Sequence, residues 1–273
     1  MSANPDHRHG GRPREPILNL PGAVIGLIAV LALVHVVREF LSAQDDFLAM
    51  VQFAFVPARM TVWFSPDRLN EVVESIGAAG STGVVQHLRL ARFLLGDGEG
   101  YPWTLLTYGL LHGSWPHLLT NVVWLAAFGS PVARRLGPMR FLLLFAAATI
   151  GGALLHWWAR PLEVLPLVGA SAGVSGAMAA AIRFVFSPGV HFSGLGDDAA
   201  VRAIPAERFG GIWRNSRALL FIVVWFVTNI LFGAGLVPIF GEESSIAWEA
   251  HIGGFVAGLL LFPLLDRGPV RPR

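Results

Sequence analysis

"VGASAGVSGAMAAAIRF", residues 168–184, is a run of small and apolar residues that holds two serines four positions apart, Ser171 and Ser175. Residues at this spacing lie on one face of a helix. In one interpretation the small residues only let membrane helices pack closely. In the other, one serine hydroxyl performs chemistry, and the rest of the sequence helps to distinguish the two.

The composition indicates a membrane protein. Of the 273 residues, 54% are hydrophobic and 14% are charged, whereas soluble proteins carry about 25% charged residues. We therefore expect contact with a lipid bilayer. The arginines are dispersed between apolar segments, which argues against a nucleic-acid partner. Cysteine is absent, and its absence excludes disulfides and thiol chemistry.

Charge-poor windows divide the chain. A helix that crosses the hydrocarbon core needs about 20 apolar residues. The windows lie between Glu15 and Arg38 and at about 115–132, 141–159, 168–182, 218–237 and 246–265. We predict an all-α polytopic membrane protein, with six spans in one domain over residues 17–267. Residues 1–16 are polar and are predicted to form a disordered basic cytoplasmic tail, and residues 268–273 a short C-terminal tail.

Arginine placement predicts the orientation, because cytoplasmic connections are enriched in Lys and Arg. With six spans, the N-terminal tail, the connections 133–140 and 184–217, and the C-terminus all lie on the arginine-rich side. Both termini are then cytoplasmic. The long first connection, about 41–114, is also apolar in places, and we expect part of it to lie in the membrane interface without forming a seventh span.

Polar residues begin three of the predicted spans: His117 and Asn121 the second, Ser171 the fourth and His251 the sixth. These three spans run in the same direction, so their first turns lie at similar depth. A neutral imidazole can take the proton of a serine hydroxyl. Side-chain and backbone N–H groups can stabilise the oxyanion of a tetrahedral intermediate. The set therefore suits acyl transfer.

Each of these residues also has a structural interpretation. The serines can serve packing, and a membrane histidine or Asn121 can simply form hydrogen bonds between helices. A metal site built from His112, His117 and His251 would lack any carboxylate or cysteine ligand, so we expect none. A transporter is disfavoured because no inverted repeat is visible and no carboxylate lies deep in a span.

Three motifs together resemble the rhomboid intramembrane serine proteases. They are "HGSWPHLLTN" at 112–121, "GASAGVSG" at 169–176 and "AHIGGFVAG" at 250–258. Each motif is weak alone, but their order and their places on the predicted spans are specific. The similarity extends from about residue 101 to residue 265.

The resemblance implies a six-helix rhomboid-like bundle and a serine endopeptidase that hydrolyses peptide bonds in or near transmembrane segments of other membrane proteins. It makes Ser171 the nucleophile and His251 the base. It places His117 and Asn121, with the backbone N–H of Ser171, around the oxyanion. Because the chemistry needs only Ser, His and water, we expect no cofactor. The expected location is a bacterial inner (cell) membrane.

One position departs from the family pattern. The residue after the nucleophile is usually Gly, but here it is Ala172. The literal Gly-x-Ser-Gly string is found one turn later and contains Ser175. We favour Ser171 because it keeps the motif register and lies nearer the helix start. If Ala172 crowds the oxyanion site, the alternative is a catalytically inactive rhomboid-like protein that binds membrane substrates.

Overall fold

The structure is a computed structural model that describes residues 19–78, 84–190, 195–233 and 247–269. The described residues are organised as helices without a β-strand, and only an isolated bridge between Phe55 and Leu167 departs from this. The all-α prediction is therefore confirmed. The predicted tail 1–16 and the C-terminal tail from residue 270 lie outside the described residues.

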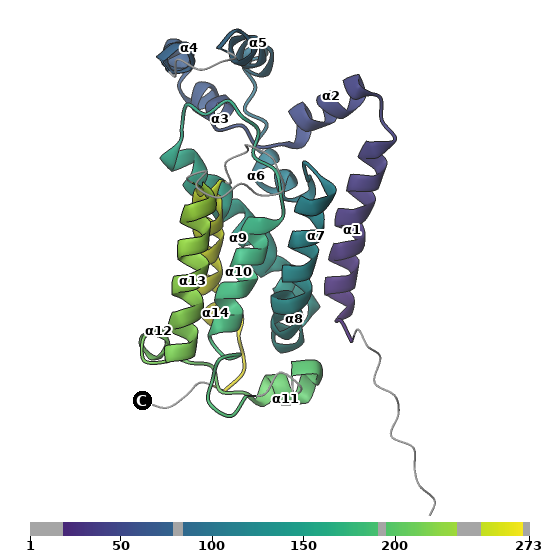
Figure 1. The fold of residues 1–273 in the computed structure, drawn as a ribbon, viewed down its shortest axis with the longest axis vertical. Helices are drawn as coiled ribbons and strands as arrows, with labels where there is room; N and C mark the ends of the chain where they lie inside the picture. The colour runs from purple at the N-terminus through teal and green to yellow at the C-terminus, as the bar shows by residue number, and fades with distance from the viewer. Residues whose placement is uncertain (1–18, 79–83, 191–194, 234–246, 270–273) are drawn as a thin grey trace, which may run out of the picture.

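Helices occupy all six windows in which spans are predicted (Figure 1). They are α1 (Gly22–Glu39), α7 (Trp115–Trp124) with α8 (Ser130–Leu136), α9 (Pro138–Ala159), α10 (Ser171–Ile182), α13 (Ser216–Gly233) and α14 (Trp248–Leu265). By length and composition α1, α9 and α14 are long and apolar enough to cross a membrane, while α10 and the apolar part of α13 are shorter. The number of six spans stays a prediction.

The second window is not one continuous α-helix. A π-helical turn, η3 (Leu125–Gly129), separates α7 from α8. Pro131 follows at the start of α8, and a proline can neither donate a backbone hydrogen bond nor fit beside the carbonyl of the preceding turn. The hydroxyl of Ser130 donates to the backbone oxygen of Ala126 at 2.6 Å. These local features explain why the chain widens here into a π turn.

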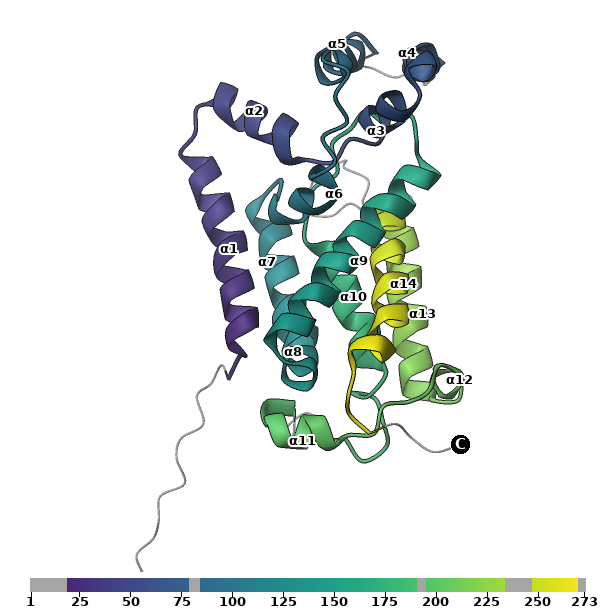
Figure 2. The same cartoon turned by 180° about the vertical axis from the view of Figure 1, so that it is seen from behind.

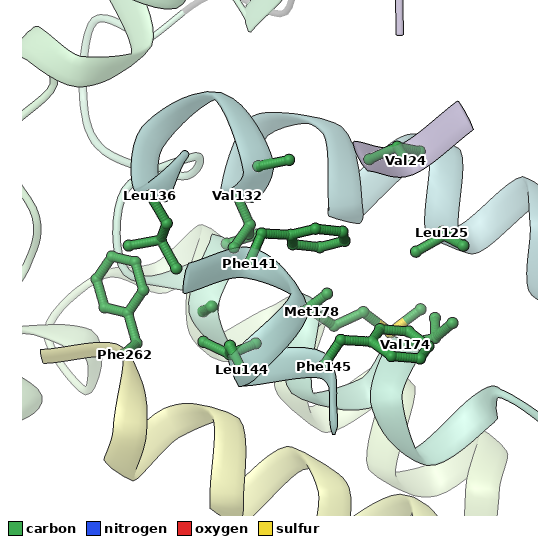
Figure 3. Packing of buried hydrophobic residues seen from close by; sticks show 14 of the residues in the cluster. Val24, Leu125, Val132, Leu136, Phe141, Leu144, Phe145, Val174, Met178 and Phe262 are labelled. Carbon is green, nitrogen blue, oxygen red and sulfur yellow. The ribbon is translucent and has the colours of Figure 1, made fainter. Parts of the chain in front are cut away.

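The largest apolar cluster lies where α1, α7, α8, α9, α10 and α14 meet (Figure 3). It includes Val24, Leu125, Val132, Leu136, Phe141, Leu144, Phe145, Val174, Met178 and Phe262. Each fully buried side chain of this size stabilises the fold by about 1.5–3 kcal/mol relative to exposure. The cluster fixes the positions of α7 and α10, the helices that carry His117 and Ser171.

Helices α9, α10 and α14 approach one another through small residues. A Cβ atom added to Gly254 would meet the backbone of Ala172, and one added to Gly258 would meet the backbone of Gly176. Gly253 instead faces α9, where an added Cβ would lie 2.7 Å from the Cβ of Leu155. Such contacts between backbones are what small residues permit in membrane helices, and they bring the start of α14 against the start of α10.

The described part of the first connection begins with four short α-helices, which lie at one end of the bundle (Figures 1 and 2). These are α2 (Ala43–Phe53), α3 (Pro57–Phe64), α4 (Leu69–Ala78) and α5 (Val84–Leu95), with the 3₁₀ turn η1 (Pro66–Arg68) between α3 and α4. Among the described residues of this connection, no helix is long and apolar enough to span a membrane. The short α6 (Thr104–Thr107) and the 3₁₀ turn η2 (Tyr108–Leu110) then lead into the bundle.

The opposite end of the bundle gathers α8, α11 (Asp198–Ala203) and α12 (Phe209–Ile212) (Figure 1). Arg134 forms an ion pair with Asp198 at 2.6 Å. Arg135 is buried and pairs with Asp266 at 2.9 Å. These pairs connect the arginine-rich end of α8 with α11 and with the residues after α14.

Candidate active site

Ser171 is the first residue of α10, directly after a turn that requires glycine. Gly169 has φ +121°, and an added Cβ would lie 2.7 Å from Nε2 of His117. The backbone N–H of Gly169 donates to Tyr108 O at 3.0 Å, which anchors the turn. The first hydrogen bond that closes the helix runs from Val174 N–H to Ala170 O at 3.0 Å. The N–H of Ser171 therefore has no partner within its own helix.

His251 lies in the first turn of α14 and faces Ser171. Its Nε2 is 2.7 Å from the hydroxyl oxygen of Ser171, within normal hydrogen-bond distance. The close backbone contact of Gly254 on α14 with Ala172, the second residue of α10, makes this approach possible. The structure thus brings together two of the predicted site residues from segments 80 positions apart.

His117 lies near Ser171, beside the turn at Gly169. The point where a Cβ of Gly169 would stand is 2.7 Å from Nε2 of His117 and 3.7 Å from the hydroxyl oxygen of Ser171. The hydroxyl of Ser114 accepts from the backbone N–H of His117 at 3.4 Å, and this cap fixes the start of α7. In addition to the backbone N–H of Ser171, the imidazole of His117 is therefore placed near the candidate nucleophile.

Asn121 follows one turn later on α7 and is 4% exposed. Its amide nitrogen donates to the backbone oxygen of His117 at 3.0 Å. An amide NH₂ carries two N–H groups, so this bond uses only one of them. All four predicted site residues are thus on the three helices α7, α10 and α14, whose first turns meet near the end of the bundle where α2–α5 lie (Figure 2).

Ser175 has a different environment from Ser171. Its hydroxyl donates to the backbone oxygen of Ser171 at 2.7 Å, and the residue is 3% exposed. A serine bonded back to the carbonyl four residues earlier serves its own helix. Ser171 is partly exposed and faces an imidazole instead.

His112, which precedes α7, supports the turn before Ser171. The residue is fully buried, and its Nε2 accepts from the backbone N–H of Ala170 at 3.4 Å. Its ring packs edge-on against that of His117, with 5.1 Å between the ring centroids. Arg38 of α1 donates to the backbone oxygen of His112 at 2.7 Å. The segment before α7 is thereby tied to both α1 and α10.

Sequence reasoning missed two partners of the site. Asn229 of α13 forms a hydrogen bond with Nδ1 of His251. Glu249 lies near the start of the predicted span 246–265 and is only 5% exposed. Its carboxylate is 2.6 Å from Nε of Arg160 and 3.5 Å from Nδ1 of His156. That ion pair ties the first turn of α14 to the end of α9. A polar residue in an apolar span was the available signal for Asn229.

The methyl group of Ala172 packs against α9. The residue is fully buried in a cluster with Tyr108 and Ala250, and a Cβ on Gly152 of α9 would collide with the Cβ of Ala172. The methyl is therefore part of the contact between α9 and α10. The expectation that it crowds the oxyanion site has no support in this packing.

Ala172→Gly is accordingly expected to lower stability without raising turnover. Loss of one buried methyl costs about 1 kcal/mol, and glycine within a helix costs about 1 kcal/mol more. Thermal denaturation and reporter cleavage of the purified variant measure both effects. A several-fold rise in turnover at unchanged stability would contradict this expectation.

Comparisons of the sequence with family models and with known proteins identify relatives of this chain. The family model described as the rhomboid domain matches residues 99–267. The chain is 26% identical over 251 residues to RHOMBOID-like protein 4 of Arabidopsis thaliana, an alignment that covers 91% of this chain and 52% of that protein. It is 26% identical over 174 residues to the mitochondrial RHOMBOID-like protein 12 of Arabidopsis thaliana, covering 62% of this chain and 48% of the relative.

A bacterial relative matches a shorter stretch. Over 82 residues the chain is 38% identical to the putative rhomboid protease YdcA of Bacillus subtilis (strain 168), with 30% of this chain and 41% of the relative aligned. The chain thus spans about half the length of the curated relatives it matches.

Proposed function

The chain belongs to the rhomboid family, and from this premise we propose that it is an intramembrane serine endopeptidase that cleaves membrane proteins in or near their transmembrane segments. The observation that carries the proposal is the 2.7 Å contact between the Ser171 hydroxyl and Nε2 of His251. A hydroxyl becomes a competent nucleophile when an adjacent base takes its proton. The expected partners are transmembrane protein substrates, which enter from the lipid bilayer.

In the proposed mechanism, the Ser171 oxygen attacks the scissile carbonyl carbon while Nε2 of His251 takes the hydroxyl proton. His251 then gives this proton to the leaving amine, and an acyl-enzyme remains on Ser171. A water molecule then attacks the ester carbonyl while Nε2 of His251 takes its proton, and His251 returns this proton to the Ser171 oxygen as the second product leaves. No group other than Ser171, His251 and water takes part in bond making.

The oxyanion formed in both steps needs hydrogen-bond donors. We propose that the backbone N–H of Ser171 and the side chains of His117 and Asn121 supply them. His117 supports this role by its position beside Gly169 and Ser171. The N–H of Ser171 supports it by its place at the start of α10. Loss of one such donor in another protease costs about 100- to 1000-fold in turnover.

The test is cleavage of a generic single-span reporter by the purified protein in detergent, beside Ser171→Ala. Wild type should release two fragments whose formation follows enzyme concentration, and Ser171→Ala should release none. If the folded wild type releases no fragment, the protease proposal fails, and co-purification of the intact reporter with the protein then tests the alternative of an inactive rhomboid-like protein that binds membrane substrates.

We further propose that the protein resides in a bacterial inner (cell) membrane with both termini cytoplasmic. The supporting observation is that α8, α11 and α12, with Arg134, Arg135 and Arg202, lie together at the end of the bundle opposite α2–α5 (Figure 1). Arginine-rich ends face the cytoplasm. A C-terminal fusion to a reporter enzyme that is active only outside the cytoplasm should be inactive, and an active fusion would overturn the orientation.

A further inference from the structure

Asn229 is a buried polar residue in an apolar helix. It is 8% exposed on α13, while the residues on either side of it, Thr228 and Ile230, are exposed on the surface of the bundle. A polar side chain that faces the interior of a membrane bundle rarely lacks a function or a hydrogen-bond partner. Its position on the inner face of α13 directs it to α14.

The packing of α13 on α14 fixes the position of Asn229. Trp225 stacks on Phe255, with 4.6 Å between ring centroids. Asn229 lies four residues after Trp225, and His251 lies four residues before Phe255. Because the two helices run in opposite directions, one turn along the contact brings Asn229 to His251 (Figure 1). The hydrogen bond between Asn229 and His251 therefore lies one helical turn from the Trp225–Phe255 contact, in the same interface between α13 and α14.

The orientation of the amide follows from its second contact. The amide nitrogen of Asn229 donates to the backbone oxygen of Trp225 at 2.7 Å. A carbonyl oxygen can only accept, so the nitrogen and not the oxygen must face it. The side-chain oxygen of Asn229 is then the atom that meets Nδ1 of His251. The amide cannot be turned around without setting two acceptors against each other.

This arrangement determines the tautomer of His251. An amide oxygen has no proton to give, so Nδ1 of His251 must carry the hydrogen that joins them. In a neutral imidazole the other nitrogen, Nε2, then has the free lone pair. Nε2 is the atom at 2.7 Å from the Ser171 hydroxyl. The hydrogen bonds therefore all point the same way: the Ser171 hydroxyl donates to His251, His251 donates to Asn229, and Asn229 donates to the Trp225 carbonyl.

We propose that Asn229 is a positioning residue that holds His251 in the tautomer and ring orientation required to take the proton of Ser171. The inference rests on the proposed protease function and adds a third member to its Ser–His pair. The role is that of the residue that orients the histidine in other nucleophile–histidine systems, which can be an aspartate or an asparagine. Here it comes from α13, so the packing of this helix on α14 and the alignment of the base are linked.

The test compares Asn229→Leu with Asn229→Asp. Leucine keeps the approximate volume but removes the acceptor, whereas a protonated aspartate keeps both an acceptor for Nδ1–H of His251 and a donor for the Trp225 carbonyl oxygen. Thr228→Val, one residue away on the exposed side of the same helix, is the matched control. The measurements are kcat and KM for reporter cleavage, the rate of Ser171 labelling by a fluorophosphonate probe, and the thermal midpoint.

A correctly positioned general base contributes about 100- to 10,000-fold, and we expect Asn229→Leu to lose at least about 10-fold of this in kcat. KM should change less than about two-fold, and the labelling rate should fall in parallel with kcat, because both need the Ser171 proton removed. Asn229→Asp should restore most of the loss, and Thr228→Val should match wild type. Full activity in the folded leucine variant, or an equal loss in the aspartate variant, would overturn the inference.

An imidazole spectrum separates this inference from the protease proposal. In protein labelled with ¹⁵N-histidine, the signals of His251 are identified by their loss in His251→Gln. Wild type should show the Nδ1-protonated tautomer, and Asn229→Leu should shift the population toward Nε2 protonation. If wild type neither cleaves nor becomes labelled, the protease proposal fails while this spectrum still decides the positioning role. A wild-type His251 protonated at Nε2 would refute that role.

Discussion

Ser171→Ala is expected to abolish both cleavage of a membrane reporter and covalent labelling by a fluorophosphonate probe, whereas Ser175→Ala should retain both. Of these two serines, Ser171 places its hydroxyl 2.7 Å from an imidazole nitrogen, while the hydroxyl of Ser175 is bonded to the backbone of its own helix. Loss of the nucleophile in a serine protease lowers kcat by about a million-fold, which is below detection in this assay. The probe reports the same serine without requiring a membrane substrate.

The Ser175→Ala variant serves as the matched control, since it also removes a serine hydroxyl, one turn later on the same helix. Removing a hydroxyl that bonds its own helix should change the free energy of unfolding by no more than about 1 kcal/mol. Both variants should therefore show thermal midpoints close to that of wild type. Labelling that persists in Ser171→Ala and disappears in Ser175→Ala would reverse the assignment of the nucleophile.

The sequence predicted the helices better than their interruptions. Apolar windows mark α1, α9 and α14 because each is a long apolar helix. The π turn before Pro131 is associated with one proline and one side-chain hydrogen bond of Ser130, and an average of hydropathy over a window carries no signal for either. The four short helices between Ala43 and Leu95 were anticipated only as an interfacial segment. Their local cluster around Val56 and Leu94 forms by contacts between residues distant in sequence.

For the candidate site, the sequence likewise predicted some of the residues and missed the partners of others. Ser171, His251, His117 and Asn121 were identifiable because they fall in short motifs at the starts of predicted spans. Asn229 and Glu249 were not assigned partners, because their hydrogen bonds depend on how α13 and α14 are rotated about their axes. A helix periodicity gives the residues that share a face but not the face of the neighbour that they meet. The role of the Ala172 methyl could not be predicted from the sequence, because it depends on where Gly152 of α9 lies.

Gly254→Ala is expected to lower cleavage by about 100-fold or more, because a displacement of about 1 Å at a catalytic site can cost that much. A Cβ at this position would stand 2.6 and 2.8 Å from two backbone carbons of Ala172. Backbone atoms cannot rotate away as side chains do, so α14 must move from α10. His251 moves with α14 and Ser171 stays with α10, so the hydrogen bond between them lengthens.

The same substitution at Gly26 of α1 is the control, because an added Cβ there has nothing within 4 Å. Alanine is the better helix former by about 1 kcal/mol, so Gly26→Ala should be neutral or slightly stabilising. Overpacking at Gly254 should cost about 1–3 kcal/mol, which reporter cleavage and thermal denaturation measure together. Labelling of Ser171 should fall as steeply as cleavage, since both depend on His251. Wild-type labelling in a folded Gly254→Ala protein would mean that the close contact of α10 and α14 does not set the distance between base and nucleophile.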